Sequence, residues 1–220
     1  VESLLLDLKE AFGEHADLTT TRGKIHDYLG MTIDYSVKHS VQFTMFDYLK
    51  DVIATLPDRL STNRIFNTPA ADHLFTINED ATKLSTKDAE VFHSTVAKLL
   101  FAAKRARPDI QTSIAFLCTR VKSPDEDDWK KLIRVLGYIK HTIFLPLTIG
   151  WDGTGNIYWY VDASFGVHND MRSHTGAVMT LGRGAALSLS TKQKINTKSS
   201  TEAELVGVVL LEAAMLKLFL

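Results

Sequence analysis

Two acidic residues occupy positions where folded proteins seldom place a carboxylate. Asp162 lies in the β-rich segment Tyr158–Phe165, and Glu204 lies in a segment of helical periodicity that begins near Ser200. A buried carboxylate is costly unless a partner or a cation compensates its charge. Two such carboxylates offer the oxygen ligands that magnesium prefers while leaving room for water and a phosphate substrate. The pair therefore predicts a divalent-metal site.

The sequence around Glu204 also allows a structural role. Thr201-Glu202-Ala203-Glu204 matches the T-x-x-E capping box, in which the glutamate only closes the start of a helix, and Ser199-Ser200-Thr201-Glu202 matches the S-x-x-E form equally well. If Ser199 or Ser200 is the cap, Glu202 lies at the helix start and Glu204 can face inward. Spacing alone leaves both roles for Glu204 open.

The elements that must position these acids are strands and a closing helix. Strand patterns cover residues 147–151, 157–165, 176–181 and 186–190, with glycine-containing turns between them. The segments after Gly155 predict a three-stranded antiparallel meander followed by the helix from Ser200. Asp162 follows Tyr158, Tyr160 and Val161 in a strand that is apolar on both faces, which is typical of a central strand.

The rest of the chain is predicted to be mainly helical. A short amphipathic helix over residues 1–12 precedes a β-hairpin formed by residues 24–36 and 41–44. Further helices are expected from Thr44, as a cap, to Pro57, from Thr86 with Ser85 at its start, over residues 110–121, and from Ser123 as N-cap with Pro124 and Glu126 behind it. Residues 60–86 read as an irregular connector that wraps another surface. The fold class is therefore α+β.

Composition limits the classes of function. The 220-residue chain is 45% hydrophobic and 23% charged, as in globular proteins, and its net charge of −1 predicts no overall attraction to nucleic acid. The single cysteine, Cys118, excludes an internal disulfide and reads as a core residue. We expect no signal peptide and no membrane helix. Zinc is disfavoured because His168 and His174 have no cysteine near them.

Two clusters of basic residues could contact phosphates. Lys104-Arg105-Ala106-Arg107 either closes a helix C-terminus, which the helix dipole favours, or contacts phosphate. No acid lies between Arg183 and Ser200, a run that is either a solvated loop or a positive field for a nucleic-acid backbone and contains Arg183, Lys192, Lys194 and Lys198. Both alternatives stay open for each cluster.

Several ordered segments together resemble the Pol polyproteins of copia-type retrotransposons. Tyr160-Val161-Asp162-Ala163-Ser164-Phe165, Arg172-Ser173-His174-Thr175-Gly176, Ser190-Thr191-Lys192-Gln193-Lys194 and Lys198-Ser199-Ser200-Thr201-Glu202-Ala203-Glu204-Leu205 resemble the ribonuclease H domain. Tyr28-Leu29-Gly30-Met31-Thr32-Ile33 resembles the end of the reverse transcriptase palm. Segments near Thr68, Val96, Arg107 and Trp129 resemble the region between the two catalytic domains. The match runs in order from about residue 24 to residue 207.

The resemblance implies a domain order and a site. Residues 1–60 would be the end of the palm and the start of the thumb, residues 61–147 a helical thumb and connection region, and residues 148–220 an incomplete ribonuclease H-like domain. Asp162 and Glu204 would be catalytic metal ligands for Mg²⁺, with Mn²⁺ as the alternative ion. Contacts to nucleic acid would come from Ser173, Thr175, Arg183, Lys192, Lys194, Lys198, Ser199 and Ser200, and a primer-grip-like segment would comprise Tyr28, Leu29, Gly30 and Met31.

The implied partners are an RNA/DNA hybrid, a template-primer and the remaining parts of the polyprotein, in an intracellular setting that is either a cytoplasmic virus-like particle or the nucleus. Oligomeric state is left undefined. The parent would copy RNA into DNA and cut the RNA of hybrids with two metals. The polymerase aspartates are absent here and the later ribonuclease H aspartates would lie beyond Leu220, so we expect this chain to be weak or inactive. A catalytically dead remnant that binds nucleic acid or is purely structural is the alternative.

Overall fold

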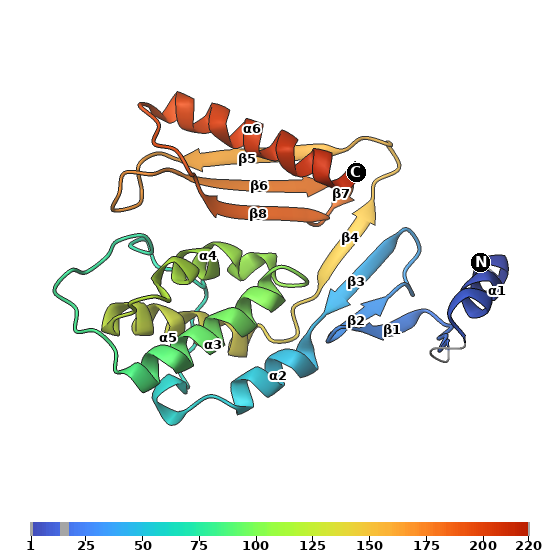
Figure 1. Cartoon of the computed structure of the whole chain (residues 1–220), viewed down its shortest axis with the longest axis horizontal. Coiled ribbons are helices and arrows are strands. Elements are labelled where there is room, and N and C mark those ends of the chain that lie inside the picture. Colours follow the sequence, from blue (N-terminus) through green and yellow to red (C-terminus); the bar gives the residue numbers. More distant parts are fainter. Residues whose placement is uncertain (1, 14–17, 220) are drawn as a thin grey trace.

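The chain forms an α+β structure with two antiparallel sheets and a helical bundle. The computed structural model describes residues 2–13 and 18–219. A five-stranded sheet has the order β1-β2-β3-β4-β7, and a three-stranded sheet has the order β5-β6-β8. Figure 1 shows α6 along one side of the three-stranded sheet and the bundle on its other side. Among the described helices, none combines the length and apolar character needed to cross a membrane.

The five-stranded sheet joins parts of the chain that are far apart in sequence. Its strands are β1 Ile25–Tyr28, β2 Met31–Asp34, β3 Ser40–Thr44, β4 Leu147–Trp151 and β7 Gly182–Arg183. β4 has the predicted bounds, but it pairs with β3 of the N-terminal region rather than with β5, the next strand in the chain. β7, which was predicted as a turn, adds a short fifth strand beside β4. The pairing of β3 with β4 therefore ties the N-terminal hairpin to the last third of the chain.

The predicted two-stranded hairpin is in fact three strands, so that prediction is wrong in detail. Residues 24–36, expected as one strand, contain the tight turn at Leu29 and Gly30 between β1 and β2. Both turn residues have positive φ, 49° and 74°, as a two-residue type I′ turn requires. Leucine is unusual in such a turn, which is why the sequence did not signal it.

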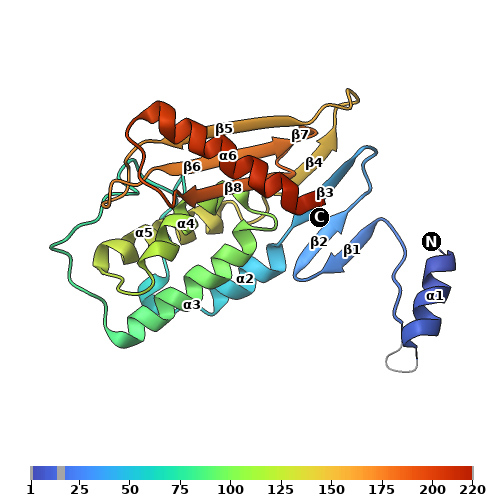
Figure 2. The ribbon, with the colours of Figure 1, turned by 45° about the horizontal axis from the view of Figure 1, so that its top comes forward.

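The helical elements follow the predicted periodicity closely. They are α1 Glu2–Phe12, α2 Phe46–Ala54, α3 Thr86–Ala103, α4 Gln111–Arg120, α5 Glu126–His141 and α6 Ser200–Phe219, with single 3₁₀ turns η1 Asp58–Leu60 and η2 Pro108–Ile110. Helix α1 contributes no buried residue, and Figure 2 shows it apart from the rest of the molecule. The main apolar core lies among α2, α3, α4 and α5.

Helix caps decide where these helices begin. The Ser85 side chain accepts a hydrogen bond from Asp88 N and caps α3 as predicted. For α5 the cap is Asp125, which forms a capping box with Asp128, so the predicted Ser123 cap is wrong. Thr44 does not cap α2 either, because it is the last residue of β3. At the start of α5 the sequence offers both Ser123 and Asp125 as possible caps, so the cap could not be assigned from the sequence alone.

The long connector, residues 61–85, wraps α5 as expected. Lys140 Nζ donates to Thr62 O at 3.1 Å, and Lys131 Nζ donates to Thr76 O at 2.6 Å. Where the connector crosses the helix, a Cβ atom on Gly137 would lie 2.6 Å from Phe66 Cδ2 and 2.7 Å from Arg64 O. The absence of a side chain at Gly137 therefore permits the close approach of the two segments.

The other face of the three-stranded sheet meets α4 and the connector through polar contacts. His168 Nε2 lies 3.1 Å from His174 Nδ1, His174 Nε2 lies 2.7 Å from Ser190 Oγ, and Ser190 Oγ donates to Thr112 Oγ1 at 3.2 Å. Phe75 packs against both imidazoles, with ring centroids 5.1 and 5.0 Å apart. The chain of hydrogen bonds joins β6 (His174–Thr180) and β8 (Leu187–Lys192) to α4.

Replacing Gly137 with alanine is expected to destabilise the protein by about 1–3 kcal/mol, because Phe66 and the connector backbone must move to admit the methyl group. Alanine is otherwise the better helix former by about 1 kcal/mol. Urea unfolding measures the difference. Gly176→Ala is the control, since nothing lies within 4 Å of its added methyl group. If the Gly137→Ala variant is as stable as the wild type, the connector does not approach α5 as closely at Gly137 as the structure shows.

Acidification is expected to weaken the contact between sheet and bundle. Burial lowers the pKa of His174 to about 4, from an ordinary value of 6.5, and burial also lowers the pKa of His168. The folded protein therefore binds fewer protons than the unfolded chain between these values. The contribution of the neutral His174 to the unfolding free energy is fully present above pH 6.5. About 3 kcal/mol of this contribution is lost as the pH falls to 4.

Chemical denaturation at a series of pH values measures this loss. In a His174→Gln variant the dependence of unfolding free energy on pH between 6.5 and 4 should become shallower. The control is His93→Gln, since His93 is an exposed residue of α3. An unchanged slope in His174→Gln would show that this histidine does not carry the effect.

Candidate active site

The strand β5, Tyr158–Ser164, presents Asp162 on its exposed face. Side chains alternate along a strand, so Tyr160 and Asp162 point one way while Val161 and Ala163 face α6. In the described residues β5 is at the edge of its sheet, paired only with β6. The prediction of a central strand was therefore wrong, and Tyr160, 64% exposed, accounts for the misleading apolar pattern.

Asp162 lies beside a groove between the sheet and the helical bundle. The groove has a volume of about 300 Å³, and Gly176 and Thr112 are among its lining residues. Gln111 Nε2 donates to Ser188 O at 3.2 Å at the same boundary. Gln111, Thr112 and Ser188 carried no signal in the sequence, because their role depends on a contact between segments about 80 positions apart in the chain.

Glu204 on α6 reaches the strand that carries Asp162. Its Oε1 accepts a hydrogen bond from Ala163 N at 3.2 Å, next to Asp162 along the chain. This contact satisfies a backbone donor at the free edge of β5. Glu204 is thus linked to the strand that carries Asp162, through a residue 41 positions earlier in the chain.

The start of α6 leaves Glu204 available for this role. Ser199 Oγ accepts from Glu202 N at 3.2 Å, and Glu202 Oε2 accepts from Lys198 N at 2.6 Å. The capping functions thus fall to Ser199 and Glu202, which was one of the two open alternatives. The absent side chain of Gly207 then lets α6 lie against β5 and β6, since an added Cβ would be only 3.3 Å from Val161 and Thr175.

A divalent cation would find two carboxylates on or near β5, but they reach the strand from different sides. Asp162 is exposed on the face that lines the groove, whereas Glu204 comes from α6 and is joined to the strand by one hydrogen bond, from Ala163 N. Both provide the hard oxygen donors that such ions prefer. Over residues 2–13 and 18–219 there is no cluster of three or more histidine, cysteine, aspartate or glutamate side chains that could hold a metal ion. The two carboxylates would therefore need water or further ligands to complete a shell.

Two of the predicted nucleic-acid contacts are internal instead. Ser173 and Thr175 are fully buried. The Ser173 hydroxyl bonds to Thr197 Oγ1 at 3.0 Å, and Thr175 Oγ1 accepts from Gln193 Nε2 at 2.9 Å. Gln193, 1% exposed, also donates to Ala203 O at 2.8 Å and so ties α6 to the sheet. In this structure neither hydroxyl is placed to reach a duplex.

The basic run does not form one surface. Arg183 lies on β7 opposite Gly150, in the other sheet. Lys192 pairs with Asp170 at 2.7 Å. Lys194 lines an apolar groove against α6, while Lys198 is exposed just before that helix. Ser199 and Ser200 are exposed beside Lys198.

Of the other predicted contacts, some are buried in the structure and others are exposed. In the earlier basic cluster, Arg107 is 1% exposed and bonds to Asp109 and Thr142, which makes it structural. The turn formed by Tyr28, Leu29, Gly30 and Met31 projects from the N-terminal sheet, with Tyr28 and Leu29 exposed. This turn is the one predicted contact of the N-terminal region that the fold leaves accessible.

Comparison with known proteins finds similarity to proteins of transposons. Over 188 residues the chain is 29% identical to a putative Ty5-1 transposon protein of Saccharomyces cerevisiae, covering 84% of this chain and 59% of that protein. Over 194 residues it is 28% identical to the retrovirus-related Pol polyprotein from transposon RE2 of Arabidopsis thaliana, covering 87% of this chain and 12% of the polyprotein. The chain is a relative of retrotransposon Pol proteins.

A third relative extends the comparison. Over 140 residues the chain is 30% identical to an uncharacterized mitochondrial protein of Arabidopsis thaliana, covering 63% of this chain and 58% of that protein. No family model and no solved structure gives a significant match. The chain thus spans between about one eighth and three fifths of the length of these relatives.

The cap of α6 can be separated experimentally from any role in binding. Ser199→Ala should lower the unfolding free energy by about 1 kcal/mol, because Glu202 N loses its acceptor. Ser200→Ala should change it by less than about 0.5 kcal/mol, as for an ordinary surface substitution. Thermal and urea unfolding measure both variants. Equal effects of the two would contradict the assignment of Ser199 as the cap.

Proposed function

We propose that the chain is a segment of a retrotransposon Pol polyprotein that contains the end of the reverse transcriptase and the first part of its ribonuclease H domain. In this proposal Asp162 and Glu204 belong to the site that cuts the RNA strand of an RNA/DNA hybrid. The observation that carries it is the hydrogen bond from Ala163 N to Glu204, which brings the second carboxylate to the strand of the first. The meander β5-β6-β8 and the covering helix α6 agree with it.

Asp162 and Glu204 would hold Mg²⁺, with Mn²⁺ as the alternative ion. Bound divalent metal would supply an activated water and stabilisation of the leaving oxygen. The chain's own contribution is to orient the ligands: the edge of β5 fixes Glu204 through Ala163 N, while Asp162 stays open to the groove. Because no third ligand joins them among the described residues, we expect weak metal binding by this chain.

The hybrid and template-primer would approach from the exposed surfaces around these elements. Lys198, Ser199 and Ser200 are exposed at the start of α6, where the helix dipole favours an anion. The β1–β2 turn with Tyr28 and Leu29 offers a second, separate contact as a primer-grip-like element. Ser173 and Thr175 are left out of this proposal because they are buried.

A nucleic-acid-binding remnant without catalysis is the second candidate. The observation that favours it is the incomplete ligand set, since two carboxylates alone rarely define a catalytic metal centre. This candidate predicts binding of hybrid that depends on salt but not on metal. The two candidates therefore differ in what metal does to the protein.

Mn²⁺ binding, followed by the loss of the free-ion electron paramagnetic resonance signal, tests the metal site without relying on activity. Asp162→Asn should weaken binding by at least about tenfold, because it removes a ligand. Glu204→Gln should weaken it similarly. The matched control is Asp80→Asn, an exposed acid of the connector. Binding that survives both site substitutions would refute the metal assignment.

A cleavage assay with a labelled RNA/DNA hybrid in Mg²⁺ separates the two candidates. We expect slow or undetectable cutting by the wild-type chain, and any cutting should disappear in Asp162→Asn. Robust cleavage that persists in Asp162→Asn would refute the catalytic role. Hybrid binding that is indifferent to metal would favour the remnant.

A further inference from the structure

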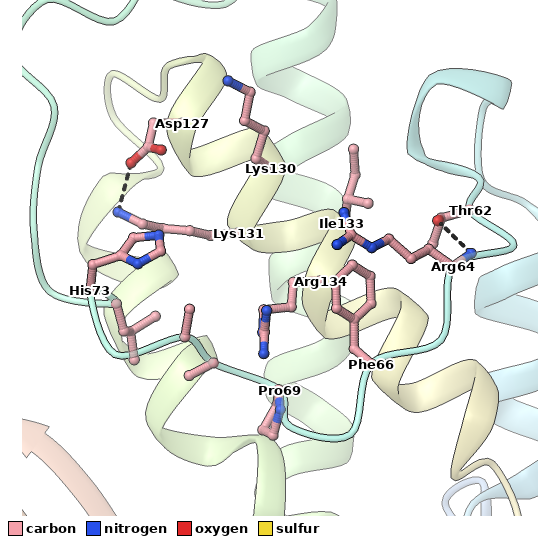
Figure 3. Close-up of a pocket in the computed structure, with 13 residues that line it drawn as sticks. Thr62, Arg64, Phe66, Pro69, His73, Asp127, Lys130, Lys131, Ile133 and Arg134 are labelled. Carbon is pink, nitrogen blue, oxygen red and sulfur yellow. Dashed lines mark hydrogen bonds and ion pairs between the residues drawn. The ribbon is translucent and has the colours of Figure 1, made fainter.

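A pocket of about 310 Å³ lies between the connector and α5, within the helical part of the chain (Figure 3). Its walls come from residues 62–74 of the connector and residues 127–134 of α5. This volume is at the lower end of the range of about 300–1,000 Å³ found for small-molecule sites. The pocket can therefore take a ligand of modest size, and the proposed function assigns it none.

The pocket is strongly basic once its internal ion pair is set aside. Lys131 Nζ lies 2.9 Å from Asp127 Oδ2, so these two charges compensate each other. Three further cations line the pocket, namely Arg64, Lys130 and Arg134. Within residues 2–13 and 18–219 none of these three forms a salt bridge. Their charge is therefore available to an anionic ligand.

The guanidinium of Arg134 is already held in place. Its Nε donates to Thr68 O at 3.2 Å and its Nη2 donates to Thr68 Oγ1 at 2.8 Å. It lies 5.0 Å from the centroid of the Phe66 ring, and the guanidinium of Arg64 lies 5.1 Å from the same centroid. Figure 3 shows both guanidinium groups near Phe66, between the connector and the helix, whereas the Lys130 side chain points away from them.

The connector that forms the far wall is fixed rather than loose. The close crossing at Gly137 seats Phe66 against α5, and the bond from Lys140 to Thr62 O holds the beginning of the wall. A pocket that is formed before binding loses little conformational entropy when a ligand enters. The contacts between the pocket and a ligand can therefore give a measurable affinity even if each contact is weak.

Apart from Thr62 and His73, the remaining lining is apolar and defines the rest of the ligand. Pro69, Ala70, Leu74 and Ile133 form this part of the pocket. Cations on one side and an apolar wall on the other suit a molecule with an anionic group joined to a flat, weakly polar one. Arginine pairs are well matched to phosphate, because their planar donors form paired hydrogen bonds to its oxygens.

We propose that this pocket binds a nucleoside phosphate, with the phosphate on Arg64 and Arg134, the base against the apolar wall and Lys130 adding positive charge nearby. The ligand can be a free nucleotide or one nucleotide of a single strand, since both present the same two groups. The proposal does not depend on the ribonuclease H assignment, because it uses neither Asp162 nor Glu204.

Calorimetric titration of the full chain with deoxyadenosine monophosphate, inorganic phosphate, deoxyadenosine and a six-nucleotide deoxyadenylate strand tests it. The monophosphate should bind at least about tenfold more tightly than phosphate or deoxyadenosine alone, because each lacks one of the two groups. A strand that binds more tightly and is displaced by the monophosphate identifies the single strand as the source. A strand that binds no more tightly identifies the free nucleotide.

The double variant Arg64→Ala/Lys130→Ala should weaken binding of the monophosphate by about tenfold or more, since one charged hydrogen bond and one nearby positive charge are lost. Both residues are exposed, so the fold should be retained, which circular dichroism and thermal unfolding check. Lys9→Ala/Lys50→Ala removes equal charge from two exposed lysines on α1 and α2 and should leave the affinity unchanged.

Three results would overturn the proposal. The first is no measurable binding of the monophosphate by the wild-type chain at millimolar concentration. The second is equal affinity for phosphate and the monophosphate, which would show that the apolar wall takes no base. The third is equal loss in the two double variants, which would reduce the effect to overall charge.

Discussion

The polar contact between the three-stranded sheet and the helical bundle is the constraint on which the rest of the structure depends. The apolar core lies in the N-terminal and helical regions, and none of its described members comes from β5, β6, β8 or α6. The sheet is instead joined to α4 by hydrogen bonds such as Gln111 to Ser188 and Ser190 to Thr112. Directional bonds fix the position of the sheet where apolar packing alone would allow it to slide. The groove beside Asp162 lies at this boundary and takes its shape from these bonds.

The edge of β5 explains why Glu204 reaches the strand that carries Asp162. An unpaired strand edge exposes backbone donors, which native proteins cover or pair. Here a carboxylate of α6 covers one of them, and the helix can come close because Gly207 has no side chain. Glu204 is therefore both a structural acceptor and a candidate ligand. The same approach leaves Leu205, Val208 and Val209 of α6 exposed, so this helix is more apolar than its packing on the sheet requires.

Local signals in the sequence predicted much of the fold, and long-range pairing accounts for most of what they missed. Ser85 and the terminal Lys140-His141 of α5 follow from capping and dipole rules that operate within one helix turn. The partner of β4 could not be predicted, because the same strand pattern suits β3 or β5 and only the tertiary fold selects between them. Asp162 and Glu204 were identifiable because a carboxylate on an apolar element is exceptional. The burial of Ser173 and Thr175 could not be predicted, since a small side chain with a hydroxyl group occurs both in cores and on surfaces.

Charge is organised by the fold rather than by the sequence. The run from Arg183 to Lys198 looks like one positive surface in sequence, but two strands and a loop disperse it, and Asp170 neutralises one member. Arg64 and Arg134 are 70 positions apart, and the crossing at Gly137 brings them to the same aromatic ring. In a chain whose net charge is −1, attraction to an anion must be local. One local cluster of positive charge therefore arises where a polar connector folds back on a helix, which is a place that no basic motif marks.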